Sequence, residues 1–450
     1  MQPNSMHILS HKITTTKDAI TAQAGLLAPL QLMVSLGLTE RINQHLPTPE
    51  SNRGFAPSLY VQTMMLMLHA GGECLEDVRH LREDGALLGM LDIKQFPTAR
   101  ALGDWLHRIG NKPQILASLI PVNQVFLQAA LGGCKAVTLD IDACEIVANK
   151  KHAQWTYKGN KGYMPMVGHI AETDQVVAYD FREGNVPPNK DNLDFIKYCE
   201  QALPSGCSLK AVRIDAAGYQ KSIIQYCHGK GLDFAIRAPI SPTIKQWISE
   251  RKEPDWETIH DDQGRPTLQS ACSTSHCIGD HQEPFRLIIQ RHPKSHQAEL
   301  ALDQEEAGTD DSYTVNGYMY RAIATAREGG SAKDIIDWYN QRGETSENRI
   351  KELKLDFNGD RLPCSDFKAN ALYFGICTLA YNLLALMRQL APAELKMHRV
   401  KAIRWSVYQL AGKVVNSGRR LLLKVSEKRV ALFERLLKLF TEYRPPPTQT

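Results

Sequence analysis

The spacing of apolar residues divides the chain into a helical beginning, a middle with strand periodicity and a helical end. Up to about residue 130, apolar residues recur every three or four positions, as in LAPLQLMVSLGLTERINQHL and SLYVQTMMLMLHAGG. This is the spacing of amphipathic helices. Pro97 and Thr98 stand where a further helix would begin, ahead of Leu102, Trp105 and Leu106. The pattern predicts a helical N-terminal region over residues 1–130.

The period changes at Lys135, where apolar residues begin to alternate with polar or small ones. KAVTLDIDACEIVA has this alternation, and GHIAETDQVVAYDFREGN resembles two strands joined by a turn. DNLDFIKYCEQAL and KSIIQYCHGKG are helical in pattern, and LKAVRID and DFAIRA are further strands. The predicted order β-β-β-α-β-α-β describes an α/β domain, a mixed sheet flanked by helices, whose first part covers residues 131–237.

Regularity falls over residues 238–317, where PFRLIIQRH is the one clear strand pattern, so we expect an insert there. MYRAIATA predicts one more strand of the main sheet, and SAKDIIDWYNQRGETSENRIKELK predicts a long helical stretch. The sheet domain should therefore resume over residues 318–390. From about residue 365 the pattern predicts helix as far as Glu442, with residues 391–450 as a C-terminal region.

Composition places the chain among folded proteins of the cytoplasm. Its 450 residues suggest two to four domains, and 43% of them are hydrophobic. The N-terminus lacks the basic-then-apolar layout of a secretory signal. The most apolar window, Ala371 to Met387, is interrupted by Thr378 and Asn382, which favours a buried helix over a membrane span. We expect a soluble cytoplasmic protein without a membrane partner.

Ten cysteines are scattered without a repeating spacing, which is typical of reduced thiols and not of a disulfide framework. One local cluster contains Cys272, His276, Cys277 and His281. Its spacing matches no common zinc motif, although a zinc-stabilised binding module remains one hypothesis for the chain.

Positive charge is concentrated near the C-terminus. The net charge is only +4, yet the span from Arg388 to Lys438 holds 13 Lys and Arg residues, including Arg419 and Arg420, against three acids. A basic end on a nearly neutral chain indicates contact with phosphates. The alternative is a solvated helical face.

Two predicted strands carry acids that need an explanation. Asp140 and Asp142 share one face of the first strand, and Asp215 follows another strand directly. Carboxylates in apolar strands are costly unless a cation meets them, and Mg²⁺ prefers carboxylate oxygens. Two such ions can clamp the attacking and leaving oxygens of a phosphodiester. The alternative places the first two acids on a solvent-facing edge strand and Asp215 in a turn.

A third acid is available in the segment Trp338 to Lys354. On a helix, Glu347 and Lys354 lie two turns apart on the same face, with Lys351 beside them. Such an acid could bind a metal while the lysines hold DNA phosphates. The alternative is an exposed helix with ordinary Glu–Lys pairing.

These motifs resemble the DDE-type insertion-sequence transposases that carry the YREK pattern, Tyr-x2-Arg-x3-Glu-x6-Lys. Tyr339 and Arg342 match the first pair, and Glu347 with Lys354 matches the second. One extra residue separates the arginine from the acid, so Glu344 is a rival. The resemblance covers about residues 135–235 and 318–390, with weaker similarity over GECLEDVRHLREDG.

The resemblance also orders the acids. In this family the first aspartate is often followed two residues later by Ser or Thr, which favours Asp142, with Cys144 in that place, over Asp140. RIDAAGY resembles the segment of the second aspartate, Asp215. The family implies an RNase H-like catalytic domain interrupted by a β-rich insert between Asp215 and the glutamate.

What the resemblance implies for function is a DNA transposase that cleaves at the ends of a mobile element and joins them to target DNA. Asp142, Asp215 and Glu347 would hold two Mg²⁺ or Mn²⁺ ions, and Tyr339, Arg342, Lys351 and Lys354 would hold the DNA near the cut. The partners would be double-stranded DNA, at terminal inverted repeats and target, and a second copy of the chain on that DNA. Alternatives are an RNase H-like nuclease that cuts without joining and an inactive DNA-binding relative.

Overall fold

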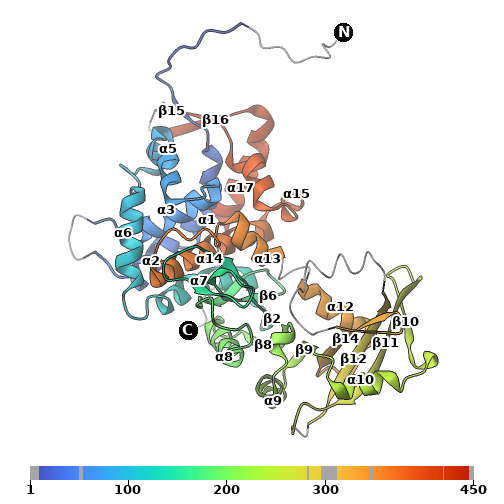
Figure 1. Ribbon diagram of the computed structural model, residues 1–450. Helices are drawn as coiled ribbons and strands as arrows, with labels where there is room; N and C mark the ends of the chain where they lie inside the picture. The colour runs from blue at the N-terminus through green and yellow to red at the C-terminus, as the bar shows by residue number, and fades with distance from the viewer. Residues whose placement is uncertain are drawn as a thin grey trace.

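The computed structural model describes residues 10–49, 54–280, 283–294, 312–343, 348–418 and 420–444. A helical body and a large mixed sheet make up these parts, and Figure 1 shows the body above and the sheet below it. The N-terminal region is helical as predicted, and Thr98 caps α6 by accepting a hydrogen bond from the Ala101 N–H. Its helices are α1 (Leu27–Ser35), α2 (Leu38–His45), α3 (Pro57–Ala70), α4 (Val78–Arg82), α5 (Gly85–Leu91), α6 (Ala99–Gly110) and α7 (Ile120–Leu131).

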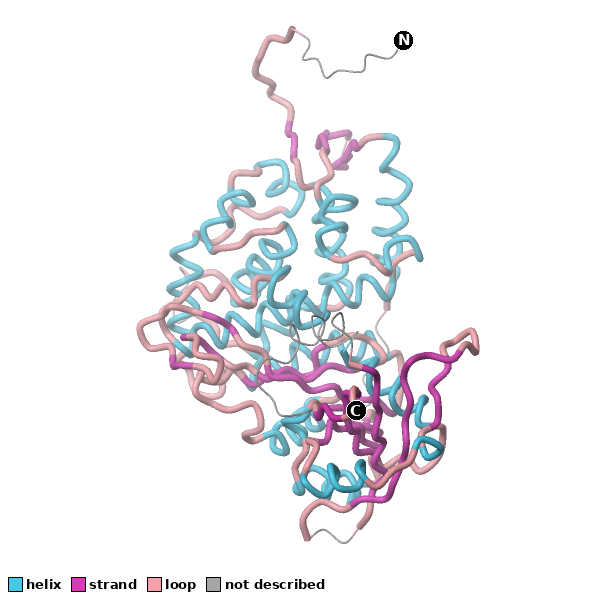
Figure 2. Tube along the Cα trace, turned by 45° about the vertical axis from the view of Figure 1, so that its right-hand side comes forward, coloured by secondary structure: helices cyan, strands magenta, loops and turns pink. Residues whose placement is uncertain are grey.

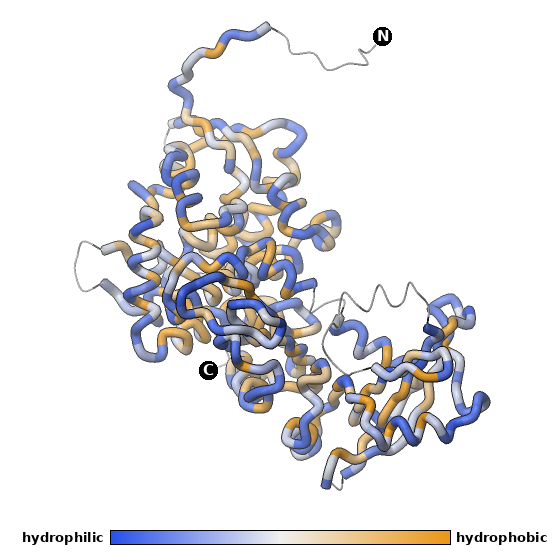
Figure 3. Tube along the Cα trace, in the orientation of Figure 1, coloured by the Kyte–Doolittle hydropathy of each residue, from blue (hydrophilic) through white to orange (hydrophobic). Residues whose placement is uncertain are grey.

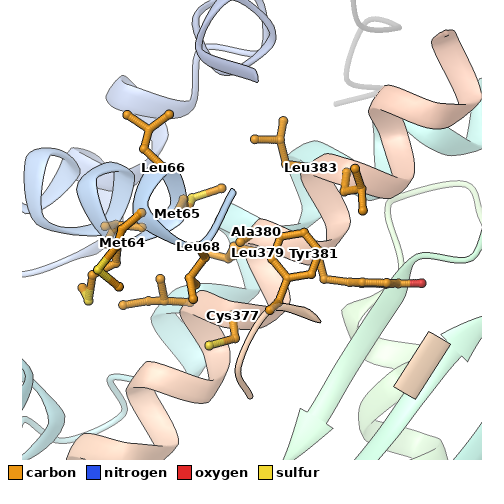
Figure 4. Close-up of a cluster of buried hydrophobic side chains, with 14 of the residues drawn as sticks. Met64, Met65, Leu66, Leu68, Cys377, Leu379, Ala380, Tyr381 and Leu383 are labelled. Carbon is orange, nitrogen blue, oxygen red and sulfur yellow. The ribbon is translucent and has the colours of Figure 1, made fainter. Parts of the chain in front are cut away.

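The centre of the helical body is α14 (Phe367–Leu390), the helix that the apolar window predicted. Although it is long and apolar enough to cross a membrane, its apolar window is entirely buried inside the protein. Helices α3, α6 and α7 pack around it. Figure 4 shows Met65 and Leu68 on the side of α3 that faces α14, where Leu379 and Leu383 lie. The buried-helix prediction is confirmed.

Asn382, one of the two polar residues in that window, ties α14 to the edge of the sheet. Its side chain accepts from the Val176 N–H at 2.8 Å and donates to the Val176 carbonyl at 2.8 Å and to the Asn123 side chain. An edge strand needs such a cover because its backbone groups are otherwise unpaired. The Asn382 contact therefore fixes the sheet against the helical body.

The first part of the sheet has the topology predicted for an RNase H-like domain. Three antiparallel strands come first, and two strands parallel to the first one follow on its other side, in the order β7-β6-β2-β8-β9. The strands are β2 (Ala136–Ala143), β6 (Met166–Ile170), β7 (Val176–Asp180), β8 (Ser208–Ile214) and β9 (Asp233–Ala238). Helices α8 (Asn192–Ala202) and α9 (Lys221–Lys230) cover one face, and their apolar side chains pack with alternate residues of these strands.

The insert extends this sheet and does not form a separate one. β14 (Tyr318–Thr325), predicted as a strand of the main sheet, pairs antiparallel with β9, and the insert strands follow in the order β12, β11, β10. Figure 2 shows these strands continuing the sheet in magenta. The further elements of the insert are α10 (Pro242–Ser249), β10 (Glu257–His260), β11 (Pro266–His276), β12 (Phe285–Pro293) and β13 (Tyr313–Val315).

Helix α12 (Ala332–Arg342) lies on the face of the sheet opposite α8 and α9. A capping box between Ser331 and Asp334 begins the helix. Ile335, Ile336 and Tyr339 pack on apolar residues of β9, β12 and β14. Figure 3 shows apolar positions, in orange, alternating along the insert strands beneath it. This packing directs the C-terminal end of α12 toward β2.

The prediction of unbroken helix from residue 365 to Glu442 is wrong. Residues Gly412–Ser417 (β15) and Arg420–Val425 (β16) form a hairpin, and β15 also pairs with β1 (Ala19–Thr21). Two consecutive β-branched residues, Val414 and Val415, favour a strand, and Gly418, at φ +62°, provides the turn. Helices α15 (Ala393–Lys396), α16 (Val400–Ile403) and α17 (Glu427–Glu442) complete this region.

Candidate active site

Asp142 and Asp215 stand next to each other at the carboxyl ends of two parallel strands. β2 and β8 pair with Asp140 beside Arg213 and Ile141 beside Ile214, so the next pair in the same register is Asp142 and Asp215. Neighbouring strands are about 4.8 Å apart. Both aspartates are partly exposed, and the Asp142 side chain is 18% exposed. The fold therefore brings two of the predicted acids together at a solvent-accessible strand end.

Asp140 has a different environment from Asp142, although both lie on the same face of β2. Its carboxylate accepts two hydrogen bonds from Arg213, Nε to Oδ1 and Nη2 to Oδ2, both at 2.7 Å. The two side chains are 1% and 2% exposed. Burial raises the pKa of Asp140, and the hydrogen bonds from Arg213 act in the opposite sense. Both oxygens of Asp140 are thus engaged in a buried bidentate ion pair.

Arg213 also connects the strands to α12. Its Nη1 donates to the Trp338 carbonyl and lies 3.4 Å from the Gln341 Oε1. The guanidinium carbon lies 5.7 Å from the centre of the Trp338 ring. One side chain therefore joins β2, β8 and α12 immediately behind the two exposed acids. Sequence analysis missed this residue, although its place two positions before Asp215 in an apolar strand indicates the same face and the need for an acidic partner.

Arg342, the last residue of α12, points toward the acids. Its Nη2 lies 3.4 Å from Asp142 Oδ1 and donates to the Ile141 carbonyl at 3.3 Å. The residue is only 6% exposed. Burial by itself lowers the pKa of Arg342, but the nearby carboxylates, Asp142 first and Asp215 also, raise it above its ordinary value. In this structure Arg342 contacts Asp142, and its contact with a DNA phosphate stays a prediction.

Cys144 and Lys354 lie on the other side of Asp142. Burial raises the pKa of the Cys144 thiol to about 12, with smaller and opposite effects from Lys354 and Asp142. A thiol with this pKa stays protonated and unreactive at neutral pH. Lys354 belongs to a π-helical turn (Glu352–Asp356) after α13 (Asn348–Lys351), and its Nζ donates to the Glu145 carbonyl. This bond ties the turn to the chain that leaves β2.

The remaining predicted residues differ in exposure. Tyr339 is 9% exposed and packs between α12 and the sheet, whereas Lys351 and Arg420 are exposed. Glu344, Glu347 and Arg419 lie outside the described residues. The predicted face shared by Glu347 and Lys354 is therefore not tested by the structure.

The two exposed aspartates suit a divalent metal in chemistry and position. They supply oxygen ligands beside each other, and the fold already places a cation, Arg342, against them. Within the described residues no group of three or more His, Cys, Asp or Glu side chains could hold a metal. The same finding applies to Cys272, His276 and Cys277, whereas His281 lies outside the description. All ten cysteines are described, and each is a free thiol.

The family model for the group 1 transposase DDE domain matches residues 9–443, almost the whole chain. The chain belongs to this family. It is a DNA transposase, an enzyme of the class that cleaves DNA and transfers strands, and members of this class depend on a divalent metal. The resemblance to DDE-type transposases found in the sequence is confirmed, and the structure has the predicted mixed α/β sheet flanked by helices.

Two other comparisons accompany this assignment. A structure of the piggyBac transposase synaptic complex with hairpin DNA is similar at 10% identity and a TM-score of 0.45, over 95% of this chain and 85% of that one. A search of curated proteins found no match. The identification of this transposase therefore rests on the family match.

Proposed function

We propose that Asp142, Asp215 and Glu347 form the catalytic acid triad of this transposase and hold two Mg²⁺ or Mn²⁺ ions. The observation that carries the proposal is the register of β2 and β8, which sets Asp142 beside Asp215 while Asp140 is engaged with Arg213. Glu347 is assigned from the YREK spacing, with Glu344 as the alternative. When bound, the ions would activate the attacking oxygen and stabilise the leaving oxygen of a phosphodiester.

The residues around the acids would fix their geometry. Arg342 would restrain the Asp142 carboxylate through the contact seen here and balance the charge of two adjacent acids. The Asp140–Arg213 pair would keep the end of β2 in a fixed position relative to the end of α12. Catalysis of phosphoryl transfer depends mainly on such positioning and on charge stabilisation, and it needs no protein nucleophile.

DNA would be held by cations near the acids and by the C-terminal region. Lys351 and Lys354 would contact phosphates flanking the cut, with Tyr339 and Arg342 beside them, and Arg419 with Arg420 would add affinity farther along. The substrates would be the terminal inverted repeats of an element and a target duplex. Because two ends must be cut and joined, we propose a homodimer on DNA, acting in the cytoplasm, with the helical residues 1–130 contributing to DNA binding.

A manganese soak tests the metal proposal directly. Crystals of the protein with Mn²⁺ should show anomalous peaks between Asp142 and Asp215, and the Asp215→Asn variant should lose them. Peaks at other residues, or none beside these two acids, would overturn the assignment. Glu347→Gln and Glu344→Gln, compared in the same crystals, identify the third ligand.

A strand-transfer assay separates the proposed reaction from cutting alone. Pre-cut end DNA incubated with a target plasmid should give joined products with the wild-type protein and none with Asp142→Asn. Cleavage without joining would favour the RNase H-like nuclease, and DNA binding without cleavage would indicate an inactive relative.

A further inference from the structure

A small sheet beside the acids carries aromatic and basic side chains that the catalytic proposal does not use. β3 (Ile146–Val147), β5 (Lys161–Tyr163) and β4 (Gln154–Trp155) pair in the order β3-β5-β4. We call residues 146–163 the basic-aromatic sheet. Between Asn149 and Lys161 it holds four lysines and one histidine and contains neither Asp nor Glu.

The aromatic side chains of this sheet face solvent. Trp155 is 62% exposed and Tyr157 is 54% exposed, which is unusual for side chains that gain by burial. Lys161 Nζ lies 5.7 Å from the centre of the Trp155 ring, and Lys158 Nζ lies 5.6 Å from that of Tyr157. Each exposed ring is thus accompanied by a cation, which combines a stacking surface with a phosphate-binding charge.

The sheet is built firmly enough to present these groups in a fixed arrangement. Tyr163, 1% exposed, anchors it by packing against Phe181 at 5.1 Å between ring centres. The carboxylate of Glu145, just before the sheet, accepts from Thr156 Oγ1 and from Asn160 Nδ2 at 3.3 Å. These bonds join Glu145 to the turn between β4 and β5 and so help to fix the shape of the sheet.

The position of the sheet places it within reach of DNA at the acids. It begins four residues after Asp142, and Val147 can be at most about 17 Å from that residue along an extended chain. Lys354, near the acids, binds the carbonyl of Glu145 at the base of the sheet. At a rise of about 3.4 Å per base pair, this reach corresponds to about five base pairs.

We propose that the basic-aromatic sheet binds the DNA end produced by cleavage, with Trp155 and Tyr157 stacking on its terminal base. Inside a duplex both faces of every base are covered by neighbours, but a cut exposes one face of the last base. Aromatic side chains bind such faces without regard to sequence, and lysines beside them hold the backbone. The proposal rests on the transposase function of the chain. It states that the protein binds a cut DNA end in preference to an intact duplex.

The test compares two duplexes of the terminal repeat that flanks the gene for this chain. One ends at the cleavage position, and the other continues past it. Binding is measured in EDTA, so that neither metal nor catalysis contributes and a failure here is distinct from a failure of the acid assignment. The wild-type protein should prefer the ending duplex, and Trp155→Ala with Tyr157→Ala should reduce this preference by about tenfold.

Matched variants separate stacking from general effects. Trp247→Ala removes another tryptophan that lies under a cation, Arg251 at 4.4 Å, but on α10 and the opposite face of the sheet, and it should keep the preference. Trp155→Phe should also keep it because a ring remains. If Trp155→Ala with Tyr157→Ala retains the wild-type preference, the stacking proposal is overturned.

The contribution of Lys158 and Lys161 is measured separately, through the salt dependence of DNA binding. Lys158→Ala with Lys161→Ala should weaken both duplexes alike and lower the slope of log affinity against log salt by about 1–2 units. Lys197→Ala with Lys230→Ala removes the same charge from α8 and α9, on the face away from the acids, and should change the slope less. Equal effects of the two pairs would contradict a specific role for the basic-aromatic sheet.

Discussion

Asp142 and Asp215 occupy matching positions at the ends of β2 and β8, one residue beyond the last paired residues, Ile141 and Ile214. Two residues back on each strand, the same register sets Asp140 against Arg213. The two strands thus carry an acid–acid pair at the surface and an acid–base pair behind it. Because side chains alternate along a strand, both pairs lie on the face that α12 covers.

This arrangement predicts different consequences for the two aspartates of β2. Asp142→Asn should fold normally and lose DNA cleavage, because a carboxylate at the proposed metal site is replaced by an amide. Asp140→Asn should lower the free energy of unfolding by about 3–5 kcal/mol, because it leaves Arg213 buried without its counter-ion. Urea unfolding and a strand-cleavage assay on both variants measure the two effects. A stable but inactive Asp140→Asn together with an active Asp142→Asn would reverse the assignment.

Apolar side chains should be able to replace the Asp140–Arg213 ion pair in its contribution to stability. Asp140→Leu with Arg213→Met exchanges the buried pair for apolar side chains, and such exchanges are often neutral or stabilising. We expect the double variant to unfold at a free energy within about 2 kcal/mol of wild type, and each single variant to be much less stable. Cleavage should nevertheless fall, since Arg213 no longer links β2 to α12. Full activity in the double variant would show that the link is dispensable.

The sequence predicts the fold well where periodicity is local. The strands β2, β6, β7, β8 and β9 and the helices between them are predicted, because alternation and helical spacing are visible in short windows. The short strands β4 and β5 are not predicted, since two or three residues are too few to show a period. The hairpin around Gly418 is not predicted, because its strands, KVVNS and RLLLKV, do not alternate apolar with polar residues. The joining of the insert strands to β14 could not be foreseen, since strand order depends on pairing between segments distant in sequence.

The site was predicted in part for the same reason. The family resemblance favours Asp142 and Asp215, with Asp140 as the alternative to Asp142. The ion pair that engages Asp140 depends on the register of β2 and β8, which brings Arg213 opposite it. The YREK pattern predicts a substrate contact for Arg342, which stays a prediction. Its contact with Asp142 depends on how α12 crosses the sheet, which no local pattern contains.

Lys354 and Lys351 test whether the location of a lysine, and not only its charge, decides its effect on cleavage. Lys354 binds the Glu145 carbonyl near the acids, whereas Lys351 is exposed one turn earlier. Lys354→Ala should slow cleavage at saturating DNA by at least about tenfold, because a phosphate beside the cut is no longer held in line. Lys351→Ala should mainly weaken binding, with a salt slope lower by about 1 unit. Identical kinetics for the two variants would indicate that only net charge matters.

The C-terminal arginines should contribute affinity and not chemistry. Arg420 begins β16 and is exposed, in a hairpin on the helical body. Arg419→Ala with Arg420→Ala should weaken binding to end DNA and reduce the salt slope by about 1–2 units, while the cleavage rate at saturating DNA stays at the wild-type level. Binding titrations at several salt concentrations give the slope. An unchanged slope would assign these charges to a solvated face.

Stability should also depend on pH through His169, which lies on β6 beside Asp140 in the register of the sheet. The ring is 2% exposed, both of its nitrogens lack a hydrogen-bond partner in the described structure, and its pKa is lowered by burial from 6.5 to about 3. Below pH 6.5 the unfolded chain therefore takes up a proton that the folded protein does not. The free energy of unfolding should fall with decreasing pH by about 1.4 kcal/mol per pH unit from this residue, between pH 6.5 and pH 3.

Replacing His169 with an apolar side chain should remove this dependence. His169→Phe, or His169→Leu if the larger ring does not fit beside Tyr381, abolishes the proton uptake and leaves no unsatisfied nitrogen. At pH 7 the variant should be as stable as wild type or more so, and between pH 6 and pH 5 its free energy of unfolding should fall less steeply by about 1.4 kcal/mol per pH unit. Urea titrations at pH 7, 6 and 5 measure the difference. His69, also buried with its pKa lowered to about 3, remains in the variant and should preserve part of the slope. If wild type and variant lose stability in parallel, His169 is not buried in its neutral form beside Tyr381.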